Sequence, residues 1–513
     1  MLKYAFILFA CCFLSPLAAQ ITPPNCYDCT WVMGVDSNHL DTVSESNTLK
    51  FYMDSLQIIR SYRKINIDFT NAAISDSQGN LQFYTNGCAI YDINDQLIQN
   101  SSGINAGYIY NYDCTYVDIQ DRGYRGQQGT IILPFPNHPQ QYYMIHKTVD
   151  GFKVQNVLNL NCKELNYTII DMSLNNGKGK VTLKNQPIIQ DTISFGQFTA
   201  CRHANGRDWW LITAQFPTNG FYKLLLTPDG LSVHDLQNIG LTFISIYYQD
   251  YSSQAVFSPD GTKYIRTTAG GFMVYDFDRC SGVLSDYKFI SVSGSYSIVG
   301  ASVSPNSKYF YMSIGRKLFQ YDLQALDIGM SKIVIDTFDG SMYPNNSNFC
   351  SQQLAPDGKI YIVPSSLDQA LHVIEQPNLR GDSCSFKQHK YILPAWNGFS
   401  LPNMPNYRLG RLVGSSCDTL ATAIAEVEQL GELRVQPNPA SDLLHIAYHT
   451  ENTAALTVAI SDYTGKKLQT LSLDSASGSI DINTSALPNG LYLCTLCDSA
   501  THRQQSVKFV VMR

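Results

Sequence analysis

The sequence has few charged residues and no long apolar run after its first twenty residues. Lys, Arg, Asp and Glu make up 15% of the 513 residues, against roughly 25% in an average globular domain. Acidic residues outnumber basic ones by 42 to 36, a net charge of −6, so no excess of positive charge is present to neutralise phosphates. No later segment reaches the roughly 20 apolar residues of a membrane-spanning helix. We therefore expect a folded chain with no transmembrane segment and no nucleic acid as partner.

The common signatures of catalytic and metal sites are also missing. The sequence contains no G-x-S-x-G, H-E-x-x-H or G-x-x-x-x-G-K-[ST], which mark many hydrolases, zinc proteases and P-loop proteins. His445 and His449 could share one face of a strand, but a zinc site needs three or four ligands and no third is near. We assign no catalytic residue, no cofactor and no metal.

The amino end has the layout of a secretory signal peptide. Met1–Lys3 is a short positive region, Tyr4–Leu14 is apolar, and Ser15–Gln20 supplies small residues for cleavage. This order predicts a signal peptide over residues 1–20. The alternative of a lipoprotein would use Cys11 or Cys12, but both lie inside the apolar run rather than after it.

Removing those two cysteines from the total of 14 leaves 12 for the exported chain. An even number in an oxidising compartment predicts some disulfides, although their pairing stays open. Cys26 with Cys29, and Cys494 with Cys497, form C-x-x-C pairs at opposite ends of the chain. A zinc site shared between them is disfavoured, since structural zinc sites usually have compact spacings.

A repeat of about 50 residues runs through the middle of the chain. It is seen most clearly in FSPDGTKYI, VSPNSKYFYM and LAPDGKIYIV, which begin at Phe257, Val303 and Leu354. Their prolines are 305 − 259 = 46 and 356 − 305 = 51 residues apart, the period of a propeller blade. Each copy reads as a strand, a tight turn and a second strand.

Three more copies are predicted upstream, from the same order of strands and turns. Their hairpin turns are placed at Asn86-Gly87, Asp150-Gly151 and Asn219-Gly220, because Asn-Gly and Asp-Gly are strong hairpin signals. Strands at Trp31–Val35 and Lys390–Leu393 are expected to share a seventh blade, which would remove the open edges. Six blades, or a β-sandwich with coincidental turns, are the alternatives.

Polar residues recur at one position of the repeat: Asp260, Asn306 and Asp357. They could form a ring of ligand-binding groups, but Asp and Asn side chains commonly bond the backbone of their own turn, and we expect that role. The longer segments Asn100–Gln128 and Gly329–Cys350 are rich in Tyr, Asn, Asp and Gly. They are where we expect binding.

Four segments of the middle region resemble a known class of secreted proteins. They are AAISDSQGNLQFYTNG, IILPFPNHPQQYYMIHK, PNLRGDSCSF and NGFSLPNMPNYRLG, beginning at Ala72, Ile131, Pro377 and Asn397. They are similar to large β-propeller proteins that travel through the type IX secretion system. The resemblance spans roughly residues 31–410 and implies a fold, not a ligand.

A separate domain follows a linker over residues 415–432. Its alternating strands, over about 80 residues, predict a small Greek-key β-sandwich. The domain closely resembles the type A C-terminal sorting domain of type IX secretion. The matching residues are Pro437, Asn438, Pro439, Asp442, Asp462, Gly465, Lys466, Leu487, Pro488, Asn489, Gly490, Tyr492 and Lys508–Val511. The resemblance implies export by the type IX translocon, removal of the tail by a sortase, and attachment to surface lipopolysaccharide or release.

The sequence therefore predicts an all-β chain of four parts: a signal peptide (1–20), a β-propeller domain (21–414), a linker (415–432) and a sorting domain (433–513). We expect an exported cell-surface or secreted protein that binds a glycan or another surface protein. The alternative is a propeller hydrolase or lyase acting on extracellular polysaccharide. Carboxylates or histidines converging in the central channel would favour the enzyme, and a channel filled by Tyr and Val the binding module.

Overall fold

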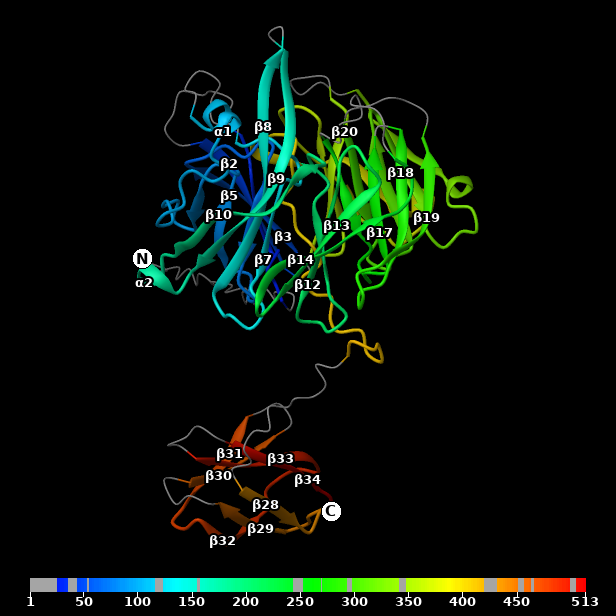
Figure 1. The fold of residues 1–513 in the computed structure, drawn as a ribbon. Coiled ribbons are helices and arrows are strands. Elements are labelled where there is room, and N and C mark those ends of the chain that lie inside the picture. The colour runs from blue at the N-terminus through cyan, green and yellow to red at the C-terminus, as the bar shows by residue number, and fades with distance from the viewer. Residues whose placement is uncertain are drawn as a thin grey trace, which may run out of the picture. The chain divides into compact units, whose positions relative to one another are not determined.

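The structure is a computed structural model that describes residues 25–35, 44–52, 55–115, 123–154, 157–242, 252–268, 270–292, 298–340, 347–418, 431–450, 456–462, 466–498 and 504–513 (Figure 1). The described residues form two compact units, one up to Asp418 and one from Gly431. Nearly all regular structure is β-strand, with short helices such as α1 (Tyr108–Asp113) and α2 (Leu174–Gly177). No helix in these ranges is long and apolar enough to cross a membrane. The expected signal peptide lies outside the described residues.

The first unit is a β-propeller whose described strands form seven sheets in chain order. The first three sheets contain β1 (Thr30–Met33), β2 (Ser44–Phe51) and β3 (Leu56–Arg63); β4 (Ala72–Ser75), β5 (Leu81–Thr85) and β6 (Ile90–Asp92); and β7 (Thr130–Pro134), β8 (Gln141–Val154), β9 (Val157–Asp171) and β10 (Lys180–Ile193). The next two contain β11 (Thr199–Arg202), β12 (Trp209–Ala214), β13 (Gly220–Thr227) and β14 (Gly230–Asn238); and β16 (Ala255–Phe257), β17 (Lys263–Thr268), β18 (Gly271–Phe277) and β19 (Leu284–Ser291). The last two contain β20 (Ile298–Val303), β21 (Tyr309–Ile314), β22 (Lys317–Asp322) and β23 (Ile333–Thr337), with β15 (Ser252–Ser253) added parallel to β20; and β24 (Phe349–Leu354), β25 (Ile360–Pro364), β26 (Asp368–Ile374) and β27 (Phe386–Asn397).

The burial of each strand follows its place in the sheet. The second strands β12 and β21, WWLITA and YFYMSI, are buried at every residue, because neighbouring sheets cover both of their faces and both faces must be apolar. The fourth strands β14 and β19 are mostly exposed. The apolar second and third strands therefore carry the repeat in the sequence, and the polar fourth strands do not.

One of the expected turns is wrong. Strand β8 passes straight through Asp150-Gly151, and pairing with β9 continues as far as Val154 opposite Val157. The resulting hairpin extends beyond the neighbouring strands (Figure 1). The turn preference of Asp-Gly is a local effect, and here the ladder of backbone hydrogen bonds along two long strands overrides it.

The seventh sheet is not built as expected. Strand β1 pairs with β2 in the first sheet, whereas β27, which contains Lys390–Leu393, pairs with β26 in the last. The sheet that contains β1 is thus completed by β2 and β3, whose sequences SESNTLKF and LQIIRSYR show little apolar alternation.

Individual hydrogen bonds, rather than a shared strand, join the first and last sheets. The amide of Asn47 donates to the Ala395 carbonyl at 3.0 Å and accepts from its N–H at 2.9 Å. The Val35 N–H donates to the Trp396 carbonyl at 2.9 Å. The Asn47 amide thus takes the place of a peptide group in the ladder.

An aromatic cluster packs at the same junction. The rings of Trp31 and Phe51, from the first sheet, lie 5.8 and 5.5 Å from the ring of Tyr361 in the last, in edge-on geometry. All three side chains are fully buried. Such pairs stabilise by roughly 0.5–1.5 kcal/mol each beyond the burial of their surface.

The second unit is a small Greek-key β-sandwich. One sheet contains β28 (Gly431–Gln436), β29 (Leu443–Thr450) and β32 (Ser477–Asn483), and the other β31 (Lys467–Leu473), β30 (Leu456–Asp462), β33 (Gly490–Asp498) and β34 (Gln504–Val511). The chain leaves β29 for the second sheet and returns to pair β32 with β29. Its apolar core includes Leu444, Ile446 and Val458, and Tyr492 stacks on Phe509.

Three disulfides form among the described cysteines: Cys26–Cys29, Cys88–Cys114 and Cys280–Cys417. The other C-x-x-C pair, in β33, stays reduced, with Cys494 buried and Cys497 partly exposed. Three residues apart, the two side chains point to opposite faces of their strand. No cluster of metal-ligating side chains occurs in the described ranges.

We expect the propeller to lose stability in mild acid because two of its histidines are buried. Burial lowers the pKa of His146 and of His372 to about 3. Since the unfolded chain binds these protons near pH 6.5 and the folded chain does not, the free energy of unfolding falls as pH drops from 6.5 towards 3, by up to roughly 1.4 kcal/mol per pH unit per histidine. Denaturant unfolding between pH 7 and 4 measures this slope. It should be shallower for His372→Gln, and an unchanged slope would contradict the assignment.

Candidate functional site

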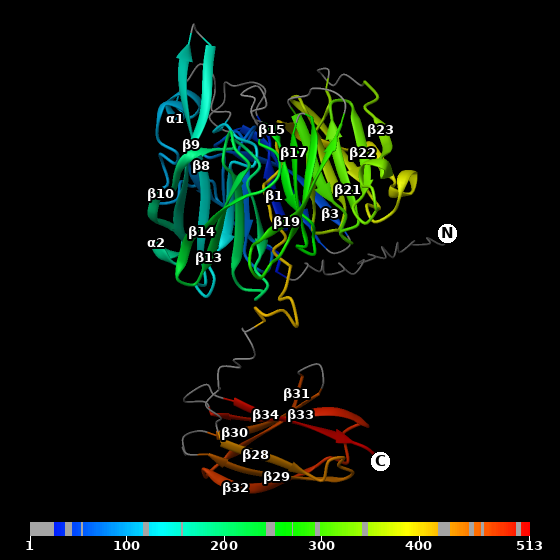
Figure 2. The same ribbon diagram turned by 45° about the vertical axis from the view of Figure 1, so that its right-hand side comes forward.

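The segment that follows the last propeller strand, residues 398–412, passes among the sheets of the first unit, and we call it the channel segment. It is the gold coil among the strands in Figure 2. The segment begins at Gly398, where a Cβ atom would collide with the Asp68 carboxylate. One oxygen of that carboxylate accepts the Phe399 N–H at 3.2 Å. Only glycine fits at this entry.

Asn403, in the middle of the channel segment, binds three sheets at once. Its side-chain amide donates to the carbonyls of Thr130, in β7, and Phe198, next to β11, at 2.9 and 3.0 Å. Its backbone N–H donates to the Asn71 carbonyl, next to β4, at 3.0 Å. The first strands of three successive sheets therefore face this one residue.

Neighbouring residues of the channel segment reach further sheets. The Met404 carbonyl accepts from Gln353, in β24, at 3.1 Å, and Asn406 donates to the Pro259 carbonyl, after β16, at 2.9 Å. Arg408 forms two hydrogen bonds of 2.6 Å with the Asp28 carboxylate, before β1. Six sheets thus hold the segment, which fixes it at the centre of the propeller.

The chain remains attached to the propeller beyond the channel segment. Arg279 donates to the Gly410 carbonyl, and the Leu412 N–H donates to the Ala204 carbonyl at 2.8 Å. The Cys280–Cys417 disulfide then fixes the chain one residue before the first unit ends. Residues 415–418, which we expected in the linker, are therefore bound to the propeller.

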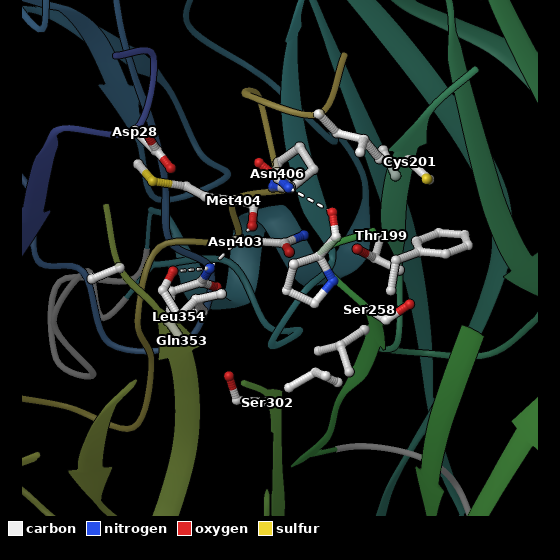
Figure 3. A pocket seen from close by; sticks show the side chains of 18 of the residues that line it. Asp28, Thr199, Cys201, Ser258, Ser302, Gln353, Leu354, Asn403, Met404 and Asn406 are labelled. Carbon is white, nitrogen blue, oxygen red and sulfur yellow. Dashed lines mark hydrogen bonds between the residues drawn. The ribbon is translucent and has the colours of Figure 1, made fainter. Parts of the chain in front are cut away.

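A cavity of about 280 Å³ remains beside the channel segment (Figure 3). Its walls come from β11, β16, β20 and β24, the first strands of four sheets, and from residues 403–406, 408 and 409 of the channel segment. The prolines of the three clear repeats, Pro259, Pro305 and Pro356, also line it and are half-buried. The repeated turns therefore lie around one cavity.

The lining of this cavity differs from both patterns that we considered. Asp28 is the one carboxylate and Arg408 the one cation among the lining residues, and they bind each other. No histidine or tyrosine lines it, and most polar groups are hydroxyls and amides such as Ser302, Thr199 and Asn403. The sequence did not predict this channel of amides and hydroxyls.

The recurring polar residues of the repeat bond their own turns, as expected. A carboxylate oxygen of Asp260 accepts the Thr262 N–H at 3.0 Å, and one of Asp357 accepts the Lys359 N–H at 3.1 Å. Asn306 accepts the Lys308 N–H at 3.2 Å. These side chains shape the turns and do not form a ring of ligands.

The two long segments in which we expected binding contribute little to the cavity. From Asn100–Gln128, Gln128 lines it, and its amide pairs with the Ala255 backbone at 2.8 and 3.1 Å. Within that segment residues 116–122, and within Gly329–Cys350 residues 341–346, lie outside the described residues. The channel segment, which sequence reasoning missed, has a usable signal: NGFSLPNMPNYRLG is rich in Asn, Pro and Gly and has no strand pattern.

In the second unit, the residues matched to the sorting motif lie at one end of the sandwich. They follow the ends of β28 and β30, precede or begin β33, or lie in the last half of β34. The antiparallel register brings these positions together, since Asp462 faces Tyr492 and Gly490 faces Val511. We call this end the sorting end. Lys466 accompanies Asp462 there, and Gly465 lies outside the described residues.

Asn438 joins the opening motif to the closing strand at the sorting end. Its amide donates to the Lys508 carbonyl at 3.1 Å and accepts the Val510 N–H at 2.9 Å. The Ala440 N–H donates to the Val510 carbonyl at 2.7 Å, between Pro439 and Asp442 in the chain. Together these bonds extend the sheet edge along β34.

Hydrogen bonds to Asn489 and to two neighbouring carbonyls hold Arg513 at the sorting end. The Arg513 N–H donates to the Asn489 side chain at 3.1 Å, and its guanidinium donates to the Ser441 carbonyl at 3.2 Å and to the Thr484 carbonyl. Next to Asn489, the Tyr492 hydroxyl donates to the Pro488 carbonyl at 2.8 Å. Leu487 packs against the core.

Comparison with known proteins identifies the family of the second unit. Residues 434–512 match the secretion system C-terminal sorting domain. No curated protein matches the chain. Among solved structures it is similar to PorZ, an essential bacterial surface component of the type-IX secretion system of Porphyromonas gingivalis, at 11% identity and a TM-score of 0.28, over 91% of this chain and 69% of that one.

Two further solved structures are similar. One is a putative 6-phosphogluconolactonase from Bacteroides fragilis, at 9% identity and a TM-score of 0.39, over 73% of this chain and 98% of that one. The other is the extracellular domain of a putative hybrid two component system from B. thetaiotaomicron, at 11% identity and a TM-score of 0.36, over 94% and 56%. At these TM-scores the likenesses carry no argument about this chain.

The match covers the sandwich except for the first three residues of β28 and Arg513. Its presence settles how the chain leaves the cell and where it goes. The chain is a β-propeller that ends in a C-terminal sorting domain, a substrate of the type IX secretion system exported to the cell surface or the extracellular space.

Proposed function

We propose that the exported propeller is a binding module for a partner at the cell surface or in the medium. The observation that supports this most is the channel segment. It occupies the centre of the propeller, where it bonds to six sheets. The channel segment leaves beside it a recess of fixed shape whose one carboxylate and one cation, Asp28 and Arg408, neutralise each other, which suits recognition.

The alternative of a polysaccharide hydrolase requires free acid groups. Glycoside hydrolases use a pair of carboxyl groups roughly 5–10 Å apart, one to protonate the leaving oxygen. Asp28 is the single carboxylate among the cavity-lining residues, and both of its oxygens accept hydrogen bonds from Arg408. A single carboxylate with both oxygens bound by Arg408 does not supply the pair of acid groups that this reaction needs. The observed groups therefore favour binding over hydrolysis.

Incubation of the chain from Ile21 to Arg513 with extracellular polysaccharides and whole cells tests the proposal. We expect the protein to co-sediment with its partner while no new reducing ends and no unsaturated sugar products form. Asp28→Asn, with its surroundings otherwise intact, serves as the control for hidden catalysis. Release of products that disappears in Asp28→Asn would replace the binding module with the enzyme.

A further inference from the structure

We propose that the cavity beside the channel segment binds one neutral sugar unit at the end of a glycan. The inference rests on the proposed binding function and gives it a site and a ligand class. The volume of the cavity, its polar and apolar lining and its charge each support this assignment.

The size of the cavity fits a single ring. Its volume is about 280 Å³, at or just below the roughly 300–1,000 Å³ of pockets for drug-sized ligands. Since a water molecule takes about 30 Å³, the space equals that of about nine waters. A single pyranose ring with its hydroxyl groups fits such a space.

Side-chain oxygens without hydrogen bonds surround the cavity. Within the part of the chain that the structure describes, no hydrogen bond is recorded for the hydroxyls of Thr199 and Ser302. The same holds for the amide oxygens of Gln353 and Asn403, and Figure 3 shows all four side chains around the same space. Three of the residues are buried, with exposed fractions of 6% for Thr199, 2% for Ser302 and 6% for Asn403. None of the four oxygen atoms is itself buried without a partner, so each stays open to water or to a ligand in the cavity.

The fixed orientation of the amides suits sugar hydroxyls. The Asn403 nitrogen donates to two backbone carbonyls, and the Gln353 nitrogen donates to the Leu354 and Met404 carbonyls at 3.1 Å. With the nitrogens occupied, the amide oxygens remain as acceptors whose positions are set by the fold. The hydroxyls of Thr199 and Ser302 can donate or accept. A sugar hydroxyl group can also donate and accept a hydrogen bond, so it can pair with both the amide oxygens and the protein hydroxyls.

The charge of the cavity selects against acidic sugars. Arg408 is already bound by Asp28 through two hydrogen bonds. A uronic acid would therefore bring its carboxylate to a site with no free cation and near the Asp28 carboxylate, and burying an unpaired charge is costly. A neutral hexose or pentose meets no such penalty.

The remaining walls are apolar. Val256 and Phe257 from β16 and Leu354 from β24 line the cavity, together with the prolines of the three repeat turns. The C–H faces of a sugar ring pack against such surfaces, and their burial adds the hydrophobic term that hydrogen bonds alone do not supply in water.

Titration of the chain from Ile21 to Arg513 with methyl glycosides of neutral hexoses and pentoses, followed by NMR saturation transfer and calorimetry, tests this site. At least one neutral glycoside should bind saturably, and the matching hexuronic acid should bind more weakly. Ser302→Leu, which fills the cavity, should weaken binding by about tenfold or more, a loss of about 1.4 kcal/mol. Ser285→Leu, on the exposed strand β19, is the matched control and should bind normally.

Equal binding by Ser302→Leu, or no saturable binding of any neutral glycoside, would overturn the site. Should Ser302→Leu fail to fold, as a thermal melt will show, Thr199→Val carries the test by removing one hydroxyl. Capture of polysaccharide or cells that survives both substitutions would refute the site while leaving the binding module. Failure of the unmodified chain to bind any extracellular partner would instead refute the proposed function.

Discussion

A chain that ends at Asn397 should fail to form the propeller, whereas a chain that ends at Asp418 should fold and unfold cooperatively. Both contain all the propeller strands, and they differ only in the 21 residues (418 − 397) that include the channel segment. Without them, the carbonyls of Thr130, Phe198 and Pro259 lose their donors. Each buried polar group left unpaired costs roughly 1–3 kcal/mol, so the combined loss is comparable with the whole stability of a domain, about 5–15 kcal/mol.

Circular dichroism and calorimetry on the two chains measure this difference. A single substitution tests it more finely: Asn403→Ala should lower the free energy of unfolding by about 2–4 kcal/mol, because it leaves two buried carbonyls unpaired. Asn306→Ala, which removes two hydrogen bonds within its own turn but leaves no buried backbone carbonyl unpaired, should cost less. A chain ending at Asn397 that melts like the longer one would show that the channel segment only fills space.

Asn438→Ala should reduce export to the level of a chain without its tail, even though the sandwich stays folded. The side chain lies on the surface and joins the opening motif to β34 by two hydrogen bonds. Losing them frees the loop before β29 and changes the sorting end without touching the apolar core. Deleting Arg513, which binds that loop from the other side, should act in the same direction.

Immunoblots of the periplasm, cell surface and medium measure the effect. Thr470→Ala is the matched control, because Thr470 is exposed on β31 and belongs to none of the motifs. We expect this control to be exported normally and Asn438→Ala to accumulate in the periplasm. Normal surface amounts of Asn438→Ala, with a tail that melts normally, would show that recognition does not depend on the geometry of the sorting end.

The sequence predicted the class of the fold because the informative strands are fully buried. Strands such as β12 and β21 must be apolar on both faces, so their runs stand out and repeat. It predicted the strand at Trp31–Val35 but not its partners β2 and β3, since these two alternate weakly and their connection lacks an Asn-Gly or Asp-Gly turn. It also misplaced the β8–β9 turn, where long-range pairing overrides a local signal.

The cavity could not be predicted because no local pattern specifies it. Its groups come from β11, β16, β20, β24 and the channel segment, and the outermost of them, Thr199 and Leu409, are 409 − 199 = 210 residues apart in the chain. The residues of the sorting end were easier to predict from the sequence. Its residues are also dispersed, over 75 positions from Pro437 to Val511, yet most lie in or beside short turn motifs with a fixed order. Their meeting at one end of the sandwich follows from strand register alone.

Fractionation of cells that produce either the full chain or the chain ending at Asp418 tests most directly the claim that the propeller is complete without its tail and that the tail serves export. The full chain should reach the surface or medium. The shorter chain should be found in the periplasm as a folded, protease-resistant protein with the Cys280–Cys417 disulfide formed. Finding the shorter chain outside the cell in normal amounts, or finding it degraded and unfolded in the periplasm, would contradict this account.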